Sequence, residues 1–197
     1  MRYFAIILTV LFTGCFFQQG NLLLDDFEGG LSPKTVDFGG GNGSEIKVSP
    51  SNKIFFDGKQ SLKIEYNSVP SGYMWAARGY GLDVKGAAQW KKNPKNIKWK
   101  KYKGLSFSLY GQGKGATIAV DIKDKNKEIF RTMIKDDTKG WKTFVCPFSG
   151  FFSRSDWQPE TALVDNVLDF PVMSFQVEVR SLGKGVIYLD KLELIRR

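Results

Sequence analysis

Apolar and polar side chains alternate with a period of two in four separate segments, residues 62–65, 105–110, 117–123 and 175–180. Successive side chains of a β-strand point to opposite faces, so each segment predicts a strand with one packed and one solvated face. Clusters of Gly, Asn, Asp and Pro separate such segments along the chain, as is typical of turns between strands. No stretch has the pattern of a long amphipathic helix. We therefore expect an all-β domain in which two sheets pack face to face as a β-sandwich.

Length and composition agree with one folded domain of this kind. The chain has 197 residues, enough for one domain with a proper core. Its content of 42% hydrophobic and 14% aromatic residues is typical of a globular protein. Aromatic side chains favour strands over helices.

The absence of histidine restricts the chemistry that the chain can perform. Ser-His-Asp and Cys-His catalysis are excluded, as is any metal site that needs an imidazole ligand. A glycosidase would need two carboxylates at a defined separation across a cleft, and the sequence singles out no such pair. We therefore expect a protein that binds a partner and does not catalyse a reaction.

The N-terminal segment predicts export. Arg2 is followed by a short apolar stretch from Phe4 to Phe12, too short to span a membrane, and then by Gly14 and Cys15. A small residue directly before a cysteine resembles the bacterial lipobox, although Phe12 stands where Leu is usual. We therefore expect a lipoprotein-type signal peptide at 1–15 with lipidation at Cys15, a tether at 16–21 and the β-sandwich domain at 22–197. The expected location is the bacterial cell envelope; an ordinary secretory signal with an incidental Cys15 is the alternative.

The net charge of +9 would suggest nucleic acid for an intracellular protein, but export argues against that partner. Basic residues concentrate between Lys91 and Lys103, interleaved with aromatic ones. A solvated loop between strands is the simplest interpretation. The alternatives are contact with an anionic polysaccharide or with lipid headgroups beside the anchor. Membrane contact is otherwise expected through the lipid anchor only.

Cys146 is the one cysteine left after processing at Cys15, so it has no disulfide partner. It lies in the apolar run 143–147, which predicts a strand, where cysteine usually acts as a small buried residue. A structural role is expected.

Six short motifs along the chain resemble those of family 11 carbohydrate-binding modules and the related CIA30 domains. They are residues 24–28 (LDDFE), 57–64 (DGKQSLKI), 102–107 (YKGLSF), Trp141 with 147–151 (PFSGF), 156–159 (DWQP) and 187–194 (IYLDKLEL). The resemblance covers nearly all of the expected domain in order. It implies a jelly roll of the galactose-binding-like type and non-catalytic binding of a polysaccharide. The CIA30 branch implies the alternative, an assembly or structural surface lipoprotein that binds protein partners.

A polysaccharide site is expected on the polar, concave face of one sheet. Sugar recognition needs flat aromatic surfaces for the C–H face of a pyranose and charged or amide groups for its hydroxyls. Both kinds occur close together in the expected strands, and the candidate partner is a β-linked glucan or a similar neutral polysaccharide. The candidate ligand-binding residues are Tyr73, Trp75, Arg78, Tyr80, Asp121, Arg131, Gln176, Glu178 and Arg180.

A structural calcium ion is expected where the first and last strands meet, because hard carboxylate oxygens suit this ion. The resemblance places its ligands at Asp26, Glu28 and Asp190, near the turn at Asp57-Gly58. A shift in the apolar phase after Asp190 also predicts a β-bulge there. A solvated edge or an ion pair with lysine is the alternative role for these carboxylates.

Two further segments are expected to be structural. The glycine-rich stretch 39–43 lacks the residues of a phosphate-binding loop and is expected to form a flexible loop. Trp157 could offer a binding platform, but the resemblance favours a loop packed onto the sandwich.

Overall fold

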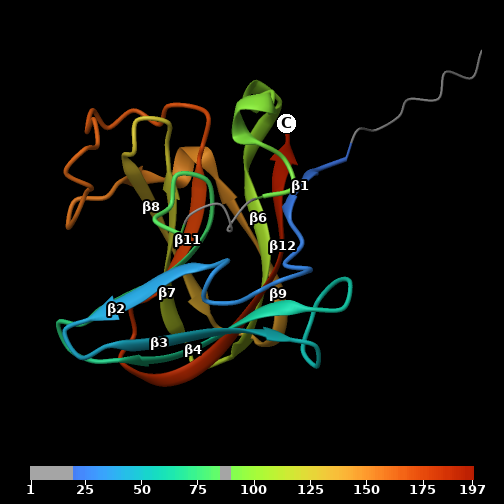
Figure 1. Cartoon of the computed structure of the whole chain (residues 1–197), viewed down its shortest axis with the longest axis vertical. Helices are drawn as coiled ribbons and strands as arrows, with labels where there is room; N and C mark the ends of the chain where they lie inside the picture. Colours follow the sequence, from blue (N-terminus) through green and yellow to red (C-terminus); the bar gives the residue numbers. More distant parts are fainter. Residues whose placement is uncertain (1–19, 85–89) are drawn as a thin grey trace, which may run out of the picture.

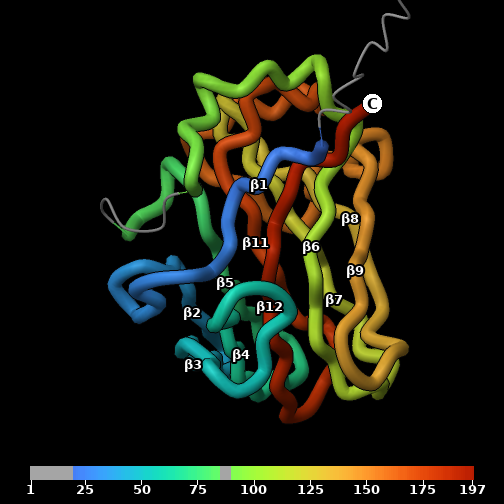
Figure 2. Tube along the Cα trace, turned by 90° about the vertical axis from the view of Figure 1, so that its right-hand side faces the viewer, coloured from blue at the N-terminus to red at the C-terminus, as the bar shows by residue number. Residues whose placement is uncertain are grey.

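The computed structural model describes residues 20–84 and 90–197, which form two antiparallel sheets packed face to face (Figure 1). Sheet A has the order β3-β4-β12-β6-β9, with β1 paired to β12, and sheet B has the order β10-β8-β7-β11-β5-β2. Figure 2 shows sheet A in front, with sheet B behind it. The all-β sandwich expected from the alternation is confirmed.

The four segments with the clearest alternation all form strands; three of these strands are longer than the pattern predicted, and the fourth, at 174–179, begins and ends one residue earlier. The strands of sheet A are β1 (Leu22–Asp25), β3 (Glu45–Ser51), β4 (Ser61–Ser68), β6 (Tyr102–Gln112), β9 (Lys139–Pro147) and β12 (Gly183–Arg196). Those of sheet B are β2 (Asp37–Gly41), β5 (Tyr73–Gly79), β7 (Ala116–Lys123), β8 (Ile129–Asp136), β10 (Phe152–Ser153) and β11 (Ser174–Val179). Three short 3₁₀ helices complete the elements: η1 (Pro94–Asn96), η2 (Trp99–Lys101) and η3 (Phe148–Gly150).

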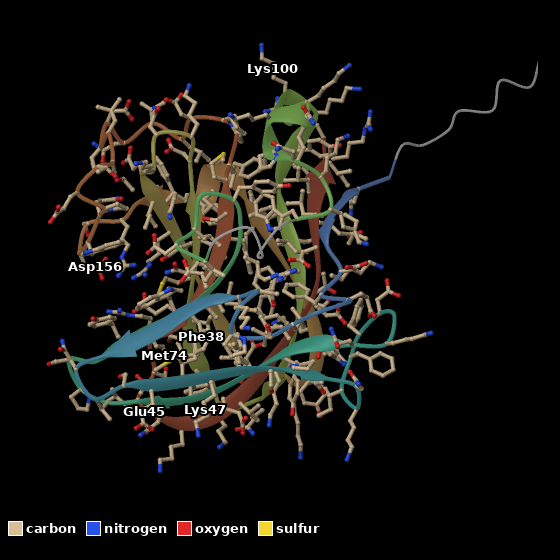
Figure 3. The ribbon with its side chains drawn as sticks, viewed as in Figure 1. Phe38, Glu45, Lys47, Met74, Lys100 and Asp156 are labelled. Atoms are coloured by element: carbon tan, nitrogen blue, oxygen red, sulfur yellow. The ribbon has the colours of Figure 1, made fainter. Side chains whose placement is uncertain are left out.

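The apolar face of each strand turns toward the other sheet and forms one core. Phe107 of sheet A and Phe175 of sheet B meet there with ring centroids 5.0 Å apart. Phe38 and Met74, labelled in Figure 3, contribute to the same core from β2 and β5. Because the inner face of sheet B is filled in this way, its outer face carries the polar half of the alternation.

Several local predictions can be compared directly with the structure. Cys146 is buried in β9, and burial raises the pKa of its thiol to about 12, in agreement with a structural role. The predicted bulge is present, because the pairing of β12 with β6 shifts between Asp190 and Glu193. The glycine stretch was predicted wrongly: Gly39–Gly41 forms the end of the edge strand β2.

In the described ranges, no helix is long and apolar enough to cross a membrane. The expected signal peptide, Cys15 and most of the tether lie outside these ranges.

Candidate functional site

One row of residues crosses the outer face of sheet B from edge to edge. Neighbouring strands pair so that one residue of each strand lies in this row. Its members are Asp37 of β2, Ala77 of β5, Gln176 of β11, Asp121 of β7, Arg131 of β8 and Phe152 of β10. The register thus brings residues from six separate parts of the sequence into one line.

A network of charges forms at the centre of this row. Arg131 donates from Nε and Nη2 to the two carboxylate oxygens of Asp121, at 2.7 and 2.9 Å. The same Nη2 also donates to Glu178, which lies one row further along β11. Gln176 adds a hydrogen bond of 3.2 Å from Nε2 to Asp121, and Arg180 pairs with Glu178 at 2.5 Å. Five of the residues expected in the binding site therefore lie together.

The loop that follows β10 adds two members that the sequence analysis missed. Arg154 lies 3.4 Å from Asp121 and pairs with Asp156 at 2.6 Å. Asp156 also lies 3.6 Å from Arg131, and Figure 3 shows it in the loop at the left edge of the molecule, on the outer side of sheet B. In the sequence, the motif containing Asp156 indicates only the family resemblance. Its contact with the sheet depends on the two-residue edge strand β10, which gives almost no alternation signal.

Burial decides how the charges of this network behave. Asp121 and Glu178 are almost fully buried beneath the arginine side chains. Burial raises the pKa of Asp121 above its ordinary value, although the bonds from Arg131 act in the opposite direction. Asp156 lies further out, and its bond from Arg154 lowers its pKa. The buried carboxylates thus hold Arg131, Arg154 and Arg180 in fixed positions, and Arg180 is the most exposed of the three.

Two aromatic rings lie beside this network and form a flat apolar surface, called here the Tyr73–Trp75 platform. Their centroids are 6.1 Å apart and their planes differ by 12°. The rings cover the backbone of β2, because Trp75 pairs with Gly39 and Tyr73 with Gly41. A Cβ atom at either glycine would lie 2.5 Å from the ring above it. Asp37 anchors one end through a hydrogen bond of 3.3 Å from Trp75 Nε1.

Arg78 was expected on this face, and the structure corrects that placement. Arg78 pairs with Phe175 across β5 and β11, so it lies on the core side of sheet B. Its guanidinium donates to both carboxylate oxygens of Asp25, at 2.7 and 3.1 Å, and to the carbonyl of Thr35 at 2.8 Å. The sequence could not reveal this, because β5 has small residues on both faces and no clean alternation.

Tyr80 is also placed differently from the expectation. It follows β5 directly after Gly79, whose φ of 136° turns the chain out of the strand. The Tyr80 ring is partly buried and packs against the core. It is therefore not part of the Tyr73–Trp75 platform.

Trp157 lies on the surface, with 55% of the residue exposed. The loop that contains Trp157 is packed onto the sandwich, as expected. The residue that holds it there is Gln158, which bonds both the N–H and the C=O of Ile129. The guanidinium of Arg154 lies 5.6 Å from the centre of the Trp157 ring. Trp157 thus extends the site at the side opposite Trp75.

The carboxylates expected to bind calcium are held by other partners. Asp190 accepts from the backbone N–H groups of Phe56, Asp57 and Lys191, and Glu28 accepts from those of Lys59 and Gln60.

Asp26 pairs with Lys91 at 2.5 Å. In the part of the chain that the structure describes, no three carboxylate or cysteine side chains come close enough together to hold a metal ion. The arrangement does not fit a calcium site, and Glu28 and Asp190 serve to fix the loop 54–60.

A match to one family covers nearly the whole chain. The model of the family 11 carbohydrate binding domain matches residues 18–197. A comparison with curated proteins finds no significant match.

Solved structures share the fold at low sequence identity. A family 11 carbohydrate-binding module from Clostridium thermocellum, solved with a β-1,3-1,4-mixed-linked tetrasaccharide, has a TM-score of 0.68 at 23% identity and covers 90% of this chain and 96% of that one. A β-1,2-glucanase from Parabacteroides distasonis has a TM-score of 0.57 at 15% identity, over 83% of this chain and 23% of the glucanase chain.

Proposed function

The chain belongs to family 11 of the carbohydrate-binding domains, and from that premise we propose that it holds a neutral β-linked glucan on the outer face of sheet B. The family consists of non-catalytic binding modules, so the protein binds a polysaccharide without cleaving it. What remains to be assigned is the sugar and the surface that holds it.

The observation that carries the proposal is the Tyr73–Trp75 platform next to the charge network. Two nearly parallel rings offer an apolar surface to neighbouring pyranose units of one extended chain. Arg131, Arg154 and Arg180 lie on the same outer face of sheet B, toward β11, β7 and β8, and buried carboxylates hold them in place. Apolar area with a few fixed polar groups is the composition typical of a ligand site.

The similarity to the Clostridium thermocellum module supports a β-glucan as the ligand, because that module was solved with a β-1,3-1,4-mixed-linked tetrasaccharide. The affinity should be modest. Sugar hydroxyls exchange bonds to water for bonds to protein with a small net gain, and binding also orders the glucan chain.

Affinity gel electrophoresis with mixed-linkage β-glucan tests the proposal. The wild-type protein should be retarded, and Trp75→Ala should remove the retardation with its melting temperature little changed. Phe55→Ala is a matched control, since Phe55 is an exposed aromatic residue in the loop 54–60 beside sheet A. Equal retardation of all three proteins would overturn the assignment of the surface. No retardation on any glucan would favour the alternative, a surface lipoprotein that binds protein partners.

We also infer export and lipid anchoring from the sequence before the domain. The support is the apolar stretch that follows Arg2 and ends at Gly14-Cys15. Metabolic labelling with palmitate should mark the wild-type protein and not Cys15→Ala. Equal labelling of the two proteins would remove the anchor from the proposal.

A further inference from the structure

One end of the sandwich is strongly basic, and sugar binding does not account for it. No acidic residue occurs between Asp83 and Asp121, and this part of the chain supplies most of the charge at this end. We use the name basic end for the positive residues there that form no ion pair within the described ranges. They are Lys92, Lys95, Lys98, Lys100, Lys101, Lys103, Arg196 and Arg197.

The fold positions these residues by means of a rigid base. The two 3₁₀ helices η1 and η2 carry lysines outward while Pro94, Ile97 and Trp99 are buried beneath them. Trp99 is fixed by a hydrogen bond of 2.9 Å from Nε1 to the carbonyl of Pro94. Most of the run lies between β5 and β6, as expected of a solvated loop, and its buried residues hold it against the sandwich. The seven lysines of the run are all exposed.

A hollow of about 300 Å³ lies within the basic end, and the beginning of the described chain forms part of its wall. The lining residues that matter here are Gly20, Asn21, Lys92, Lys98, Lys101 and Arg196. Several cationic groups around one hollow suit the phosphate group of a lipid. The hollow is also where the chain enters the domain.

Chain length links this surface to the membrane. Gly20 is five residues after Cys15, and an extended chain spans at most about 3.6 Å per residue, so the basic end must lie within roughly 20 Å of a lipid attached at Cys15. Lysines at that distance can reach an anionic membrane surface. Each lysine near the headgroups then strengthens membrane binding about fivefold.

From these observations we propose that the basic end is a docking surface for an anionic lipid membrane. The sandwich then stands on this end, at the top of Figure 1, while the outer face of sheet B faces sideways and stays open to a polysaccharide. This membrane contact goes beyond sugar binding. The orientation of the domain on the membrane rests on the proposed lipid anchor, but the attraction between the lysines and an anionic surface does not. An anionic polysaccharide could use the same charges, but it would not explain why they surround the entry of the chain.

The test uses vesicle co-sedimentation of the chain from Phe16 onward, which retains all twelve strands and carries no lipid. Vesicles rich in phosphatidylglycerol should bind the protein, and vesicles of phosphatidylcholine alone should not. The triple variant Lys92→Gln, Lys98→Gln and Lys101→Gln should weaken binding by about 100-fold.

A matched control removes the same charge elsewhere. Lys47, Lys114 and Lys184 are exposed lysines that form no ion pair in the described part of the chain, and Figure 3 shows Lys47 at the end opposite Lys100. Their triple change to Gln should leave vesicle binding within a few-fold of wild type. Equal losses in the two triple variants, or no binding of wild type, would overturn the proposal.

Two further outcomes separate the competing partners. If polygalacturonate binds through Lys92, Lys98 and Lys101 while the vesicles do not bind, the partner is a polysaccharide and the membrane proposal fails. Trp75→Ala should bind vesicles as wild type does, whether or not it binds glucan. Failure of the glucan proposal is therefore distinguishable from failure of this one.

Discussion

Trp75 and Gly39 are direct partners in the ladder between β5 and β2, and the six-membered ring of Trp75 covers the place where a side chain at position 39 would be. Gly41 has the same relationship to Tyr73. The glycines of the edge strand are therefore the support on which the aromatic platform lies, which gives the glycine-rich stretch a role that its composition alone did not reveal.

Gly39→Ala should displace the indole, because the new Cβ atom would be 2.5 Å from Trp75 Cη2. We expect the affinity for glucan to fall about tenfold, or about 1.4 kcal/mol, with a small change in the melting temperature. Isothermal titration calorimetry and thermal unfolding measure the two effects. Gly30→Ala is the control, since no atom lies within 4 Å of its Cβ position. Unchanged glucan affinity in Gly39→Ala would show that the Trp75 ring does not contact the sugar from its position above Gly39.

Arg78 connects the two sheets through its buried ion pair with Asp25 of β1. Arg78→Met should lower the free energy of unfolding by roughly 3–5 kcal/mol at neutral pH, because a buried carboxylate would lose its partner. Glucan affinity of the folded variant should stay unchanged. Chemical denaturation and affinity gels measure the two effects. If Arg78→Met were as stable as wild type but unable to bind glucan, Arg78 would be a sugar-binding residue and not a structural one.

The pH dependence of this variant provides a second check. Burial already raises the pKa of Asp25, and the Arg78 guanidinium acts against that rise. Without the guanidinium the pKa rises further above its unfolded value, so the stability deficit is full at neutral pH and shrinks as the pH falls through the raised pKa. A deficit that grows on acidification would contradict the assigned role of the pair.

The loop 54–60 should not depend on calcium, because Asp190 and Glu28 already accept backbone N–H groups. Neither chelation nor added calcium is expected to shift the melting temperature. Asp190→Ala should destabilise the protein by roughly 2 kcal/mol, since a hydrogen bond to a charged group contributes about 1.5–3 kcal/mol and water replaces part of it in this exposed loop. Differential scanning fluorimetry measures both. A clear rise in melting temperature with calcium would restore the site expected from the family resemblance.

The sequence was most informative where strands alternate cleanly. Residues 117–123 and 175–180 predicted both the strands and the face of each side chain, and the structure places Asp121, Gln176 and Glu178 together as expected. Alternation has a period of two, so a correct strand assignment also assigns the face.

The remaining errors have physical causes that a single sequence conceals. In β5, Ala76, Ala77 and Gly79 leave no contrast between the faces, and Arg78 was therefore assigned to the wrong one. Arg154 and Asp156 reach the network from a loop, and no local pattern predicts a contact across the sheet edge. The carboxylates at Asp26, Glu28 and Asp190 were expected to bind calcium, and the sequence could not show that backbone N–H groups and a lysine would contact them.

The dependence on salt should differ between the two proposed surfaces. A neutral glucan bears no charge, so its affinity for the platform should change less than twofold between low salt and 1 M NaCl. Binding of anionic vesicles to the basic end should collapse over the same range, because the screening length falls from about 10 Å at 0.1 M to about 3 Å at 1 M. Both assays use one preparation of the wild-type chain, and Trp75→Ala and the Lys92, Lys98 and Lys101 triple variant serve as reciprocal controls. If glucan binding also collapsed with salt, the lysines of the basic end, and not the outer face of sheet B, would be the place where the polysaccharide is held.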